Sequence, residues 1–307
     1  MIRKPTVLSE IARHKTVYLM ALPGVLFFFV FFYMPMPGLI IAFKNFKMSL
    51  GIWGSPWNGL DNFRFFFSSG IALRVTRNTL SLNVLFIVSI TFFQVLLALL
   101  LNEVRSGPYK KITQSVLFLP YLMSWIIVSV IVNGFLGSDT GTINQLLVYL
   151  GLEPVNWFSR AELWPTILVV LNVWKWTGYG VVIYLAAITG IDGTLYEAAT
   201  VDGANRLQRV WHITLPLLKA TVVILTILSV GRIFYGDVGL IYGIIGDNAV
   251  LFSTTDVIDT YVLRALRTSS DLGMSTAIGL WQSVMGFLLV LASNKMANHY
   301  ERDGALF

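Results

Sequence analysis

A small set of polar and charged side chains interrupts the long apolar stretches of this sequence. Lys175 lies near the middle of one stretch, with Asn172 three residues before it and Tyr179 four residues after it. Residues at these spacings share one face of a helix, so they form a polar stripe. An ionised group at membrane depth costs roughly 2.5–3.5 kcal/mol on insertion scales and needs a water-filled path or a partner. The stripe predicts a solute path, and a buried lysine hydrogen-bonded to a neighbouring helix or to a second subunit is the alternative.

Other apolar stretches hold polar residues of the same kind. Aromatic faces combined with amides and hydroxyls suit a polyhydroxylated solute, so these residues are further candidates for the path. Each of them taken singly is as well explained by packing, and Arg232 has Asp237 nearby as an ion-pair partner. The candidates are Thr91, Gln94, Ser229, Arg232, Tyr235, Trp281 and Gln282.

Enzymatic chemistry finds little support in the sequence. The three histidines, His14, His212 and His299, all lie at the ends of apolar stretches, and no pair of carboxylates falls within one. There is no Cys, which excludes a thiolate nucleophile or metal ligand. No Gly-Lys dipeptide occurs, so the phosphate-binding P-loop is absent. We therefore predict a non-enzymatic chain with no catalytic residue, no metal and no cofactor of its own.

Residues 195–216 form a polar loop between two apolar stretches, and they read as two short helices joined at Gly203. Glycine accepts the positive φ of such a turn at no steric cost. Pro216 is expected to end the second helix where the next apolar stretch begins. Glu197 is expected to complement a helix end, with Arg206 or Arg209 as its partner. The apolar faces that would meet a partner contain Leu195, Ala198, Ala199, Leu207, Val210 and Trp211.

Three motifs in this loop carry a family resemblance. Glu197-Ala198-Ala199, Asp202-Gly203-Ala204 and Ile213-Thr214-Leu215-Pro216, at this spacing, resemble the EAA loop of permease subunits of bacterial binding-protein-dependent ABC importers of the sugar-transporting branch. Residues 51–63 and 254–262 resemble the LplB-like subgroup of these permeases.

The resemblance implies the type I ABC importer permease fold and a set of partners. These are a second permease subunit, two cytoplasmic ABC ATPase copies that bind ATP and Mg, and an extracytoplasmic solute-binding protein. In that family the loop is a coupling helix that sits in a cleft of the ATPase. The residues so assigned to ATPase coupling are Glu197, Ala198, Ala199, Asp202, Gly203, Ala204, Leu207, Val210, Trp211, Ile213, Leu215 and Pro216.

Composition independently predicts an all-α membrane protein. The 307 residues are 56% apolar and only 12% charged, whereas soluble domains are about 25% charged. A bilayer core of ~30 Å requires ~20 apolar residues per helix, and six stretches are long enough. They are residues 17–43, 79–103, 112–136, 163–189, 217–241 and 272–294. We expect a segment 1–16, a transmembrane permease domain 17–294 and a tail 295–307.

Charge distribution predicts the orientation in the membrane. With the N-terminus inside, inner segments hold twelve Lys and Arg residues and outer segments hold nine, which agrees with the positive-inside rule. Both termini and the loop 195–216 are then cytoplasmic, in a bacterial cell membrane. The net charge of +6 reflects membrane topology and contact with lipid rather than nucleic acid, since no nucleic-acid-binding motif is present.

The expected function is transport of an oligosaccharide or similar polyhydroxylated solute by alternating access. A permease of the same family for a peptide or glycerol phosphate is the nearest alternative. An ion-driven secondary transporter would require mid-depth carboxylates and inverted repeats, and the predicted spans contain no acid at mid-depth. A membrane scaffold without transport is the remaining alternative.

Overall fold

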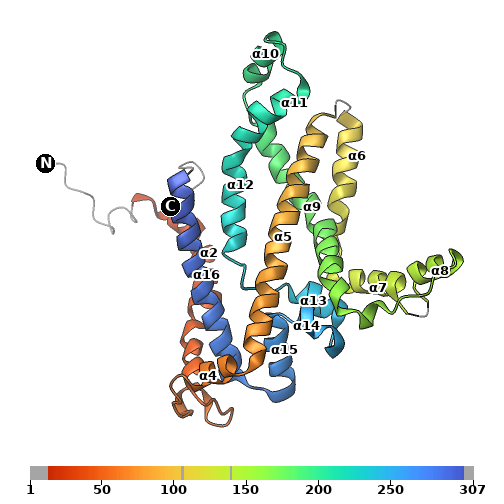
Figure 1. The fold of residues 1–307 in the computed structure, drawn as a ribbon. Helices are drawn as coiled ribbons and strands as arrows, with labels where there is room; N and C mark the ends of the chain where they lie inside the picture. Colours follow the sequence, from red (N-terminus) through yellow and green to blue (C-terminus); the bar gives the residue numbers. More distant parts are fainter. Residues whose placement is uncertain (1–12, 105–106, 139, 301–307) are drawn as a thin grey trace. The chain divides into compact units, whose positions relative to one another are not determined.

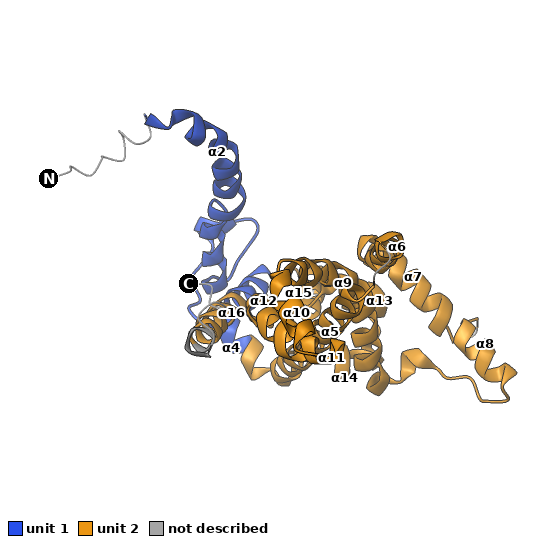
Figure 2. Cartoon of the chain, turned by 90° about the horizontal axis from the view of Figure 1, so that it is seen from above, with its two compact units in different colours: residues 1–65, 271–280 blue, residues 66–270, 281–307 orange. Residues whose placement is uncertain are grey.

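The computed structural model describes residues 13–104, 107–138 and 140–300. Helices dominate the described chain, together with one isolated bridge between Lys44 and Trp57. Two compact units are distinguished, one within residues 1–65 and 271–280 and the other within residues 66–270 and 281–307 (Figure 2). The predicted N-terminal segment 1–16 and tail 295–307 lie mostly outside the described residues.

The first unit contains the N-terminal membrane helix and an ordered loop. Residues Lys15–Phe43 form one apolar helical span of 29 residues. In the loop that follows, the Lys44 ammonium donates to the carbonyls of Ile52 (2.9 Å) and Trp53 (3.0 Å), and it lies 5.0 Å from the centre of the Trp57 ring. These contacts explain how a loop rich in Gly and Trp keeps one conformation. The helical segments are α2 (Lys15–Phe28), a π-helix (Phe29–Tyr33), a 3₁₀ helix (Met36–Phe43) and α3 (Gly51–Gly54).

The second unit is built around two long helices, α5 and α9, which pack together more extensively than any other pair. Figure 1 shows α12 running beside them, α10 and α11 at one end of this group, and α13, α14 and α15 toward the other end. The residue ranges of these three helices are Gly70–Asn102 for α5, Trp164–Thr189 for α9 and Leu215–Val230 for α12. The others are α6 (Gly107–Phe118), α7 (Trp125–Leu136), α8 (Thr142–Tyr149), α10 (Gly193–Val201), α11 (Arg206–Arg209), α13 (Val238–Ile245), α14 (Phe252–Thr255) and α15 (Ile258–Ser269). Two helices have residues in both units, α4 (Asp61–Ser68) and α16 (Leu272–Tyr300).

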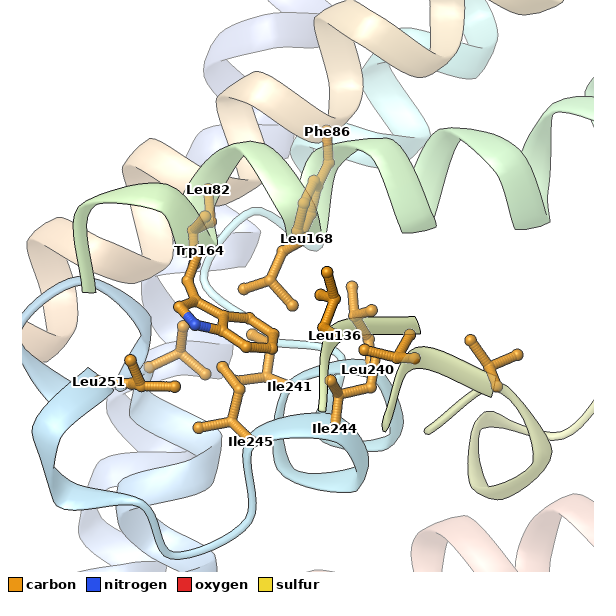
Figure 3. Packing of buried hydrophobic residues seen from close by; sticks show 13 residues of the cluster. Leu82, Phe86, Leu136, Trp164, Leu168, Leu240, Ile241, Ile244, Ile245 and Leu251 are labelled. Atoms are coloured by element: carbon orange, nitrogen blue, oxygen red, sulfur yellow. The ribbon is translucent and has the colours of Figure 1, made fainter. Parts of the chain in front are cut away.

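The apolar core lies where α5, α7, α9 and α13 meet. Leu82 and Phe86 of α5, Leu168 of α9 and Leu240 of α13 are buried together there (Figure 3). Trp164 is fully buried beside them, and its Nε1 donates to the carbonyl of Trp157 at 2.9 Å. A second cluster, which includes Ala98, Val181, Leu185 and Leu218, joins α5, α9 and α12 nearer the loop 195–216. The three long helices are therefore fixed to one another at two levels.

The described residues contain five helices long and apolar enough to cross a membrane, and a sixth if one bent pair counts as one span. The predicted third span, 112–136, is that bent pair: residues Gly107–Leu122 and α7 meet at an angle of 95°. Pro120 lacks an N–H, and Ser124 caps the new helix by accepting the Ile127 N–H at 3.3 Å. The predicted third span is therefore present as a bent pair of helices rather than as one continuous helix.

The predicted fifth span, 217–241, is also corrected. Its helix runs over Arg206–Val230, and residues 231–237 form a non-helical linker before α13. Asp237 then caps the new helix α13, with its Oδ1 accepting the Leu240 N–H at 3.0 Å. The other four predicted spans correspond to described helices, although α5 begins nine residues earlier than predicted.

Pro216 does not end the second loop helix, contrary to expectation. A π-helical turn, Val210–Thr214, precedes it, and the Leu215 N–H donates to the Val210 carbonyl five residues back. This wider turn accommodates the residue that lacks a backbone donor, as π-bulges do in other helices. The helix consequently continues from the loop into the membrane-spanning segment without interruption.

Candidate coupling loop and translocation cavity

The loop 195–216 forms a knuckle of two helices held by local caps. The Thr194 N–H donates to Asp192 Oδ1 at 2.9 Å, and this bond holds the pKa of Asp192 below its ordinary value. Gly203 has φ +79, the conformation that only glycine adopts without strain. Asn205 and Gln208 then cap α11 reciprocally, at 2.9 Å and 2.8 Å. This capping box was not predicted, although its Asn-x-x-Gln spacing is visible in the sequence.

Large apolar side chains of the knuckle are open to the surroundings. Val201 is 88% exposed, Leu207 66% and Trp211 62%. Isolated apolar residues on a surface are ordinary, but three such exposed residues on one short loop are consistent with contact to a partner. Among the other predicted coupling residues, Glu197, Ala198, Asp202, Gly203 and Pro216 are exposed, and Ala199, Ala204, Val210, Ile213 and Leu215 are half-buried.

The charged residues of the loop pair differently from the prediction for Glu197. Arg206 approaches Glu103 at the end of α5, with Nη1 3.4 Å from Oε2, and Arg209 donates to Thr200 Oγ1 at 3.1 Å. Within the described chain Glu197 forms no ion pair with either arginine. The expectation was wrong because Glu103, remote in sequence, lies closer to Arg206. Tyr196 adds a hydroxyl contact of 2.9 Å to Thr214, so the knuckle is bound to the ends of α5 and α12.

A cavity of about 780 Å³ lies between α5, α9, α12 and the linker 231–237. Four of the predicted path residues, Asn172, Tyr179, Ser229 and Arg232, line it. Thr91, Gln94 and Tyr235 do so as well. Its polar and aromatic lining also includes Asn83, Phe86, Trp176, Tyr184 and Asp237. These were not predicted as path residues, although Asn83 is a polar interruption of an apolar stretch like the others.

Amide side chains shape the walls of this cavity. Asn83 Nδ2 donates to the carbonyls of Ile233 (3.0 Å) and Tyr235 (3.1 Å), which attaches the linker to α5. Gln94 Nε2 donates to the Trp176 carbonyl at 3.0 Å, in the space that Gly180 leaves by having no side chain. Side-chain hydrogen bonds therefore join the linker to α5 and α5 to α9.

Lys175 lies apart from the cavity lining. It is only 5% exposed, and its ammonium donates to the carbonyls of Pro120 (3.3 Å), Tyr121 (3.1 Å) and Met123. The ring of Trp125 lies 5.0 Å from the same nitrogen. These are the carbonyls freed where α6 and α7 break, so the lysine serves as a cap for an interrupted membrane helix. Of the two alternatives for this residue, the contacts match the bonded lysine.

Trp281 and Gln282 also lie outside the cavity lining. Trp281 packs edge-on against Phe67 and Phe234, with ring centroids 5.4 Å and 5.3 Å away. Gln282 is buried, and its Nε2 donates to the Phe234 carbonyl (2.8 Å) and to Asp259 Oδ2 (3.1 Å). Both residues hold α16 against the linker.

The expected ion pair of Arg232 with Asp237 is not formed. The Asp237 carboxylate accepts the Trp125 Nε1–H at 3.0 Å and the Leu240 N–H at 3.0 Å. The acid that interacts electrostatically with Arg232 is Asp259. The carboxylate of Asp259 accepts a hydrogen bond from the Gly236 N–H at 2.5 Å. Within the ranges that the structure describes, no group of three or more His, Asp or Glu side chains is arranged to hold a metal ion.

Comparison with known proteins decides the class of this molecule. Residues 94–298 match the family model described as "Binding-protein-dependent transport system inner membrane component". The chain belongs to this family. It is therefore a membrane permease subunit of an ABC importer, and ATP hydrolysis belongs to a separate subunit. The predicted family, the all-α fold class and the non-enzymatic role are confirmed.

The permease has well-aligned relatives over nearly its whole length. It is 38% identical over 297 residues to Protein LplB of Bacillus subtilis, covering 97% of this chain and 93% of that protein. It is 37% identical over 305 residues to the polygalacturonan/rhamnogalacturonan transport system permease protein YteP of Bacillus subtilis, covering 98% and 94%. A solved bacterial alginate ABC transporter, in complex with an alginate pentasaccharide-bound periplasmic protein, contains a chain with 35% identity and a TM-score of 0.85, covering 96% of this chain and 98% of that one.

Proposed function

We propose that this permease imports an oligosaccharide or a similar polyhydroxylated solute through the cavity between α5, α9 and α12. The observation that carries the proposal is the lining of that cavity, which combines the aromatic side chains of Trp176 and Tyr179 with the amide of Asn172 and the hydroxyl of Ser229. Aromatic surface packs on sugar rings, while amides and hydroxyls exchange hydrogen bonds with sugar hydroxyls. The saccharides named for YteP and for the alginate transporter support the same class of solute.

The continuous helix Arg206–Val230 supports a mechanism in which the loop drives the cavity. Its 25 residues span about 37 Å at 1.5 Å per residue. One end carries the exposed residues Leu207 and Trp211, and the other end carries Ser229, which lines the cavity. A displacement of the knuckle by an ATPase would therefore move a cavity wall directly, as a rigid element transmits motion between two sites.

The proposal includes the partners that complete the transporter. Two cytoplasmic ATPase copies, which bind ATP and Mg, would receive the knuckle formed by α10 and α11. A second permease subunit would close the path, and an extracytoplasmic solute-binding protein would deliver the solute. The permease would be oriented with both termini and the loop 195–216 in the cytoplasm, within the bacterial inner membrane, as the charge distribution predicts.

ATP hydrolysis by the complete transporter in proteoliposomes tests this function. We expect the rate to rise only when the binding protein and an oligosaccharide are added together, because delivery of solute must be sensed through the permease. Double substitution of Leu207 and Trp211 by Ser should abolish that stimulation. The control is the double substitution by Ser of Tyr149 and Leu150, two exposed residues at the C-terminal end of α8, which should leave the stimulation intact. Stimulation by a transported ion alone, or a rate indifferent to saccharide, would refute the proposal.

A further inference from the structure

Few charged side chains line the cavity, and they differ in their hydrogen-bond partners. Arg232 and Asp237 are the only ionisable Arg, Lys, Asp or Glu residues among the described residues that line it. Both oxygens of Asp237 are already engaged, Oδ2 by the Trp125 indole N–H and Oδ1 by the Leu240 backbone N–H. The acid of the cavity therefore has a structural task, and the cation remains to be explained.

Arg232 is the first residue of the linker with an exposed side chain, directly after the C-cap of α12. Within the described chain its guanidinium makes no hydrogen bond or ion pair at bonding distance. Asp259 interacts with Arg232 electrostatically and without a hydrogen bond. The Oδ2 atom of Asp259 accepts hydrogen bonds from the Gly236 N–H (2.5 Å) and from Gln282 Nε2 (3.1 Å) instead. The five N–H donors of Arg232 thus remain available to whatever fills the cavity.

A cation that has no partner in the described chain and lines a cavity beside membrane-spanning helices is a candidate ligand-binding group. Its planar fork of donors matches a carboxylate, with two parallel hydrogen bonds. A single guanidinium also balances the single charge of one carboxylate, whereas a phosphate dianion would leave one charge uncompensated. The chemistry of Arg232 therefore favours a carboxylated ligand.

Asn172 supplies an independent indication of a ligand in the same cavity. Its side chain lines the cavity, the residue is 5% exposed, and its Oδ1 has no hydrogen-bond partner among the described residues. Buried polar atoms are nearly always paired, so an unpaired acceptor calls for an explanation. A hydroxyl group entering the cavity would donate to this oxygen, while Trp176 and Tyr179, four and seven residues on along α9, offer ring faces beside it.

We propose that Arg232 determines specificity for an anionic saccharide, binding the carboxylate of a uronate residue while Asn172 accepts a hydroxyl of the same chain. This inference rests on the proposed function, and it adds the charge of the solute and the residue that recognises it. Positioning of Arg232 would come from Asn83, which bonds the linker carbonyls of Ile233 and Tyr235.

Direct binding to the transporter tests the inference without the binding protein, whose own selectivity would mask that of the permease. The complete permease–ATPase complex in detergent is dialysed to equilibrium against trigalacturonate or against its carboxyl-reduced neutral analogue, each tritiated at the reducing end. We expect the acidic probe to bind the wild-type complex at least about 10-fold more tightly at low salt. The preference should shrink as salt is raised, because charge interactions at an accessible site are screened.

Substitutions then assign the preference to one side chain. Arg232→Gln should weaken binding of the acidic probe roughly 10- to 100-fold, the range expected for a charged hydrogen-bonding group. Binding of the neutral probe should change less than about 2-fold. Arg232→Lys should recover part of the loss, since it restores the charge without the fork. The matched control is Arg160→Gln, which removes an exposed arginine outside the cavity lining.

Two results would overturn the inference, and they are distinguishable. Equal affinity of the wild-type complex for both probes would refute specificity for an anionic saccharide, and it would be compatible with the proposed transport of saccharides. Failure to bind either probe, in a complex whose ATPase ignores saccharides, would remove both. If Arg232→Gln did not assemble, the wild-type preference and its dependence on salt would still test the anionic solute, and Arg232→Lys would test the assignment to Arg232. An unchanged preference in an assembled Arg232 variant would overturn that assignment.

Discussion

Replacing Lys175 by Met removes the cation that caps the break between α6 and α7 while keeping a side chain of similar length. The ammonium donates to three carbonyls, and one of them, Pro120 O, also accepts the Met123 N–H at 3.2 Å. Tyr121 O and Met123 O therefore lose the contact that satisfies them. An unpaired buried acceptor costs about 1–3 kcal/mol, so two of them predict a loss of about 2–6 kcal/mol in stability.

The assay is the midpoint of unfolding of the purified complex, followed by size-exclusion chromatography after heating in detergent. Lys175→Met should unfold at a clearly lower temperature, and assembled complex should be lost in parallel with transport. Lys111→Met is the control, because it removes an exposed lysine from α6, the helix that precedes the break. A Lys175→Met complex that melts like wild type but no longer transports would refute the capping role and return this residue to the solute path.

Three further substitutions test packing, turn geometry and charge. Gly178→Ala should prevent assembly, because the added Cβ would lie 1.9 Å from a backbone oxygen of α6. The control is Gly134→Ala, whose added Cβ meets nothing within 4 Å and which should be neutral. The measurement is a comparison of thermal stability. Gly203→Val places a β-branched residue at φ +79, at a cost of roughly 1–2 kcal/mol. It should lower the amount of ATPase that the permease pulls down, whereas the control Gly193→Val should not. Recovery of equal amounts of ATPase by the two variants would count against the hinge. Burial raises the pKa of Asp259, so the contribution of this group to stability should be greatest below the unfolded pKa of ~3.9 and fall as pH rises through the folded pKa. Asp259→Asn should flatten that part of the melting-temperature profile, and an unchanged profile would contradict this assignment.

The sequence predicts those parts of this permease that depend on local patterns. Long apolar stretches identify membrane helices because a bilayer imposes a length on each of them. The loop 195–216 is recognisable because glycine at a positive φ and flanking short helices leave their pattern in adjacent residues. Polar interruptions such as Asn172 and Ser229 indicate the cavity because desolvation makes unused polar groups costly in a membrane.

Features that depend on remote residues could not be predicted in the same way. The break near Ser124 lies in a stretch whose composition equally suits a straight helix, and it is completed by Lys175 about fifty residues later. Arg206 pairs with Glu103 rather than Glu197 for the same reason, because the nearest acid comes from another helix. The role of Lys175 itself changes from path to cap once the carbonyls it satisfies are known.

In the proposed mechanism, movement of the loop 195–216 reaches the cavity through the helix Arg206–Val230, and labelling of Ser229 tests this coupling. The chain contains no Cys, so Ser229→Cys provides a single reactive thiol within it at the cavity wall. Its reaction with a membrane-impermeant thiol reagent is followed from each side of proteoliposomes, without nucleotide and with ATP and vanadate. We predict that the thiol reacts from the cytoplasmic side without nucleotide and from the opposite side in the trapped state, and that Leu207 and Trp211 substitutions abolish the switch. Equal reactivity from the same side in both states would contradict coupling of the loop to the cavity.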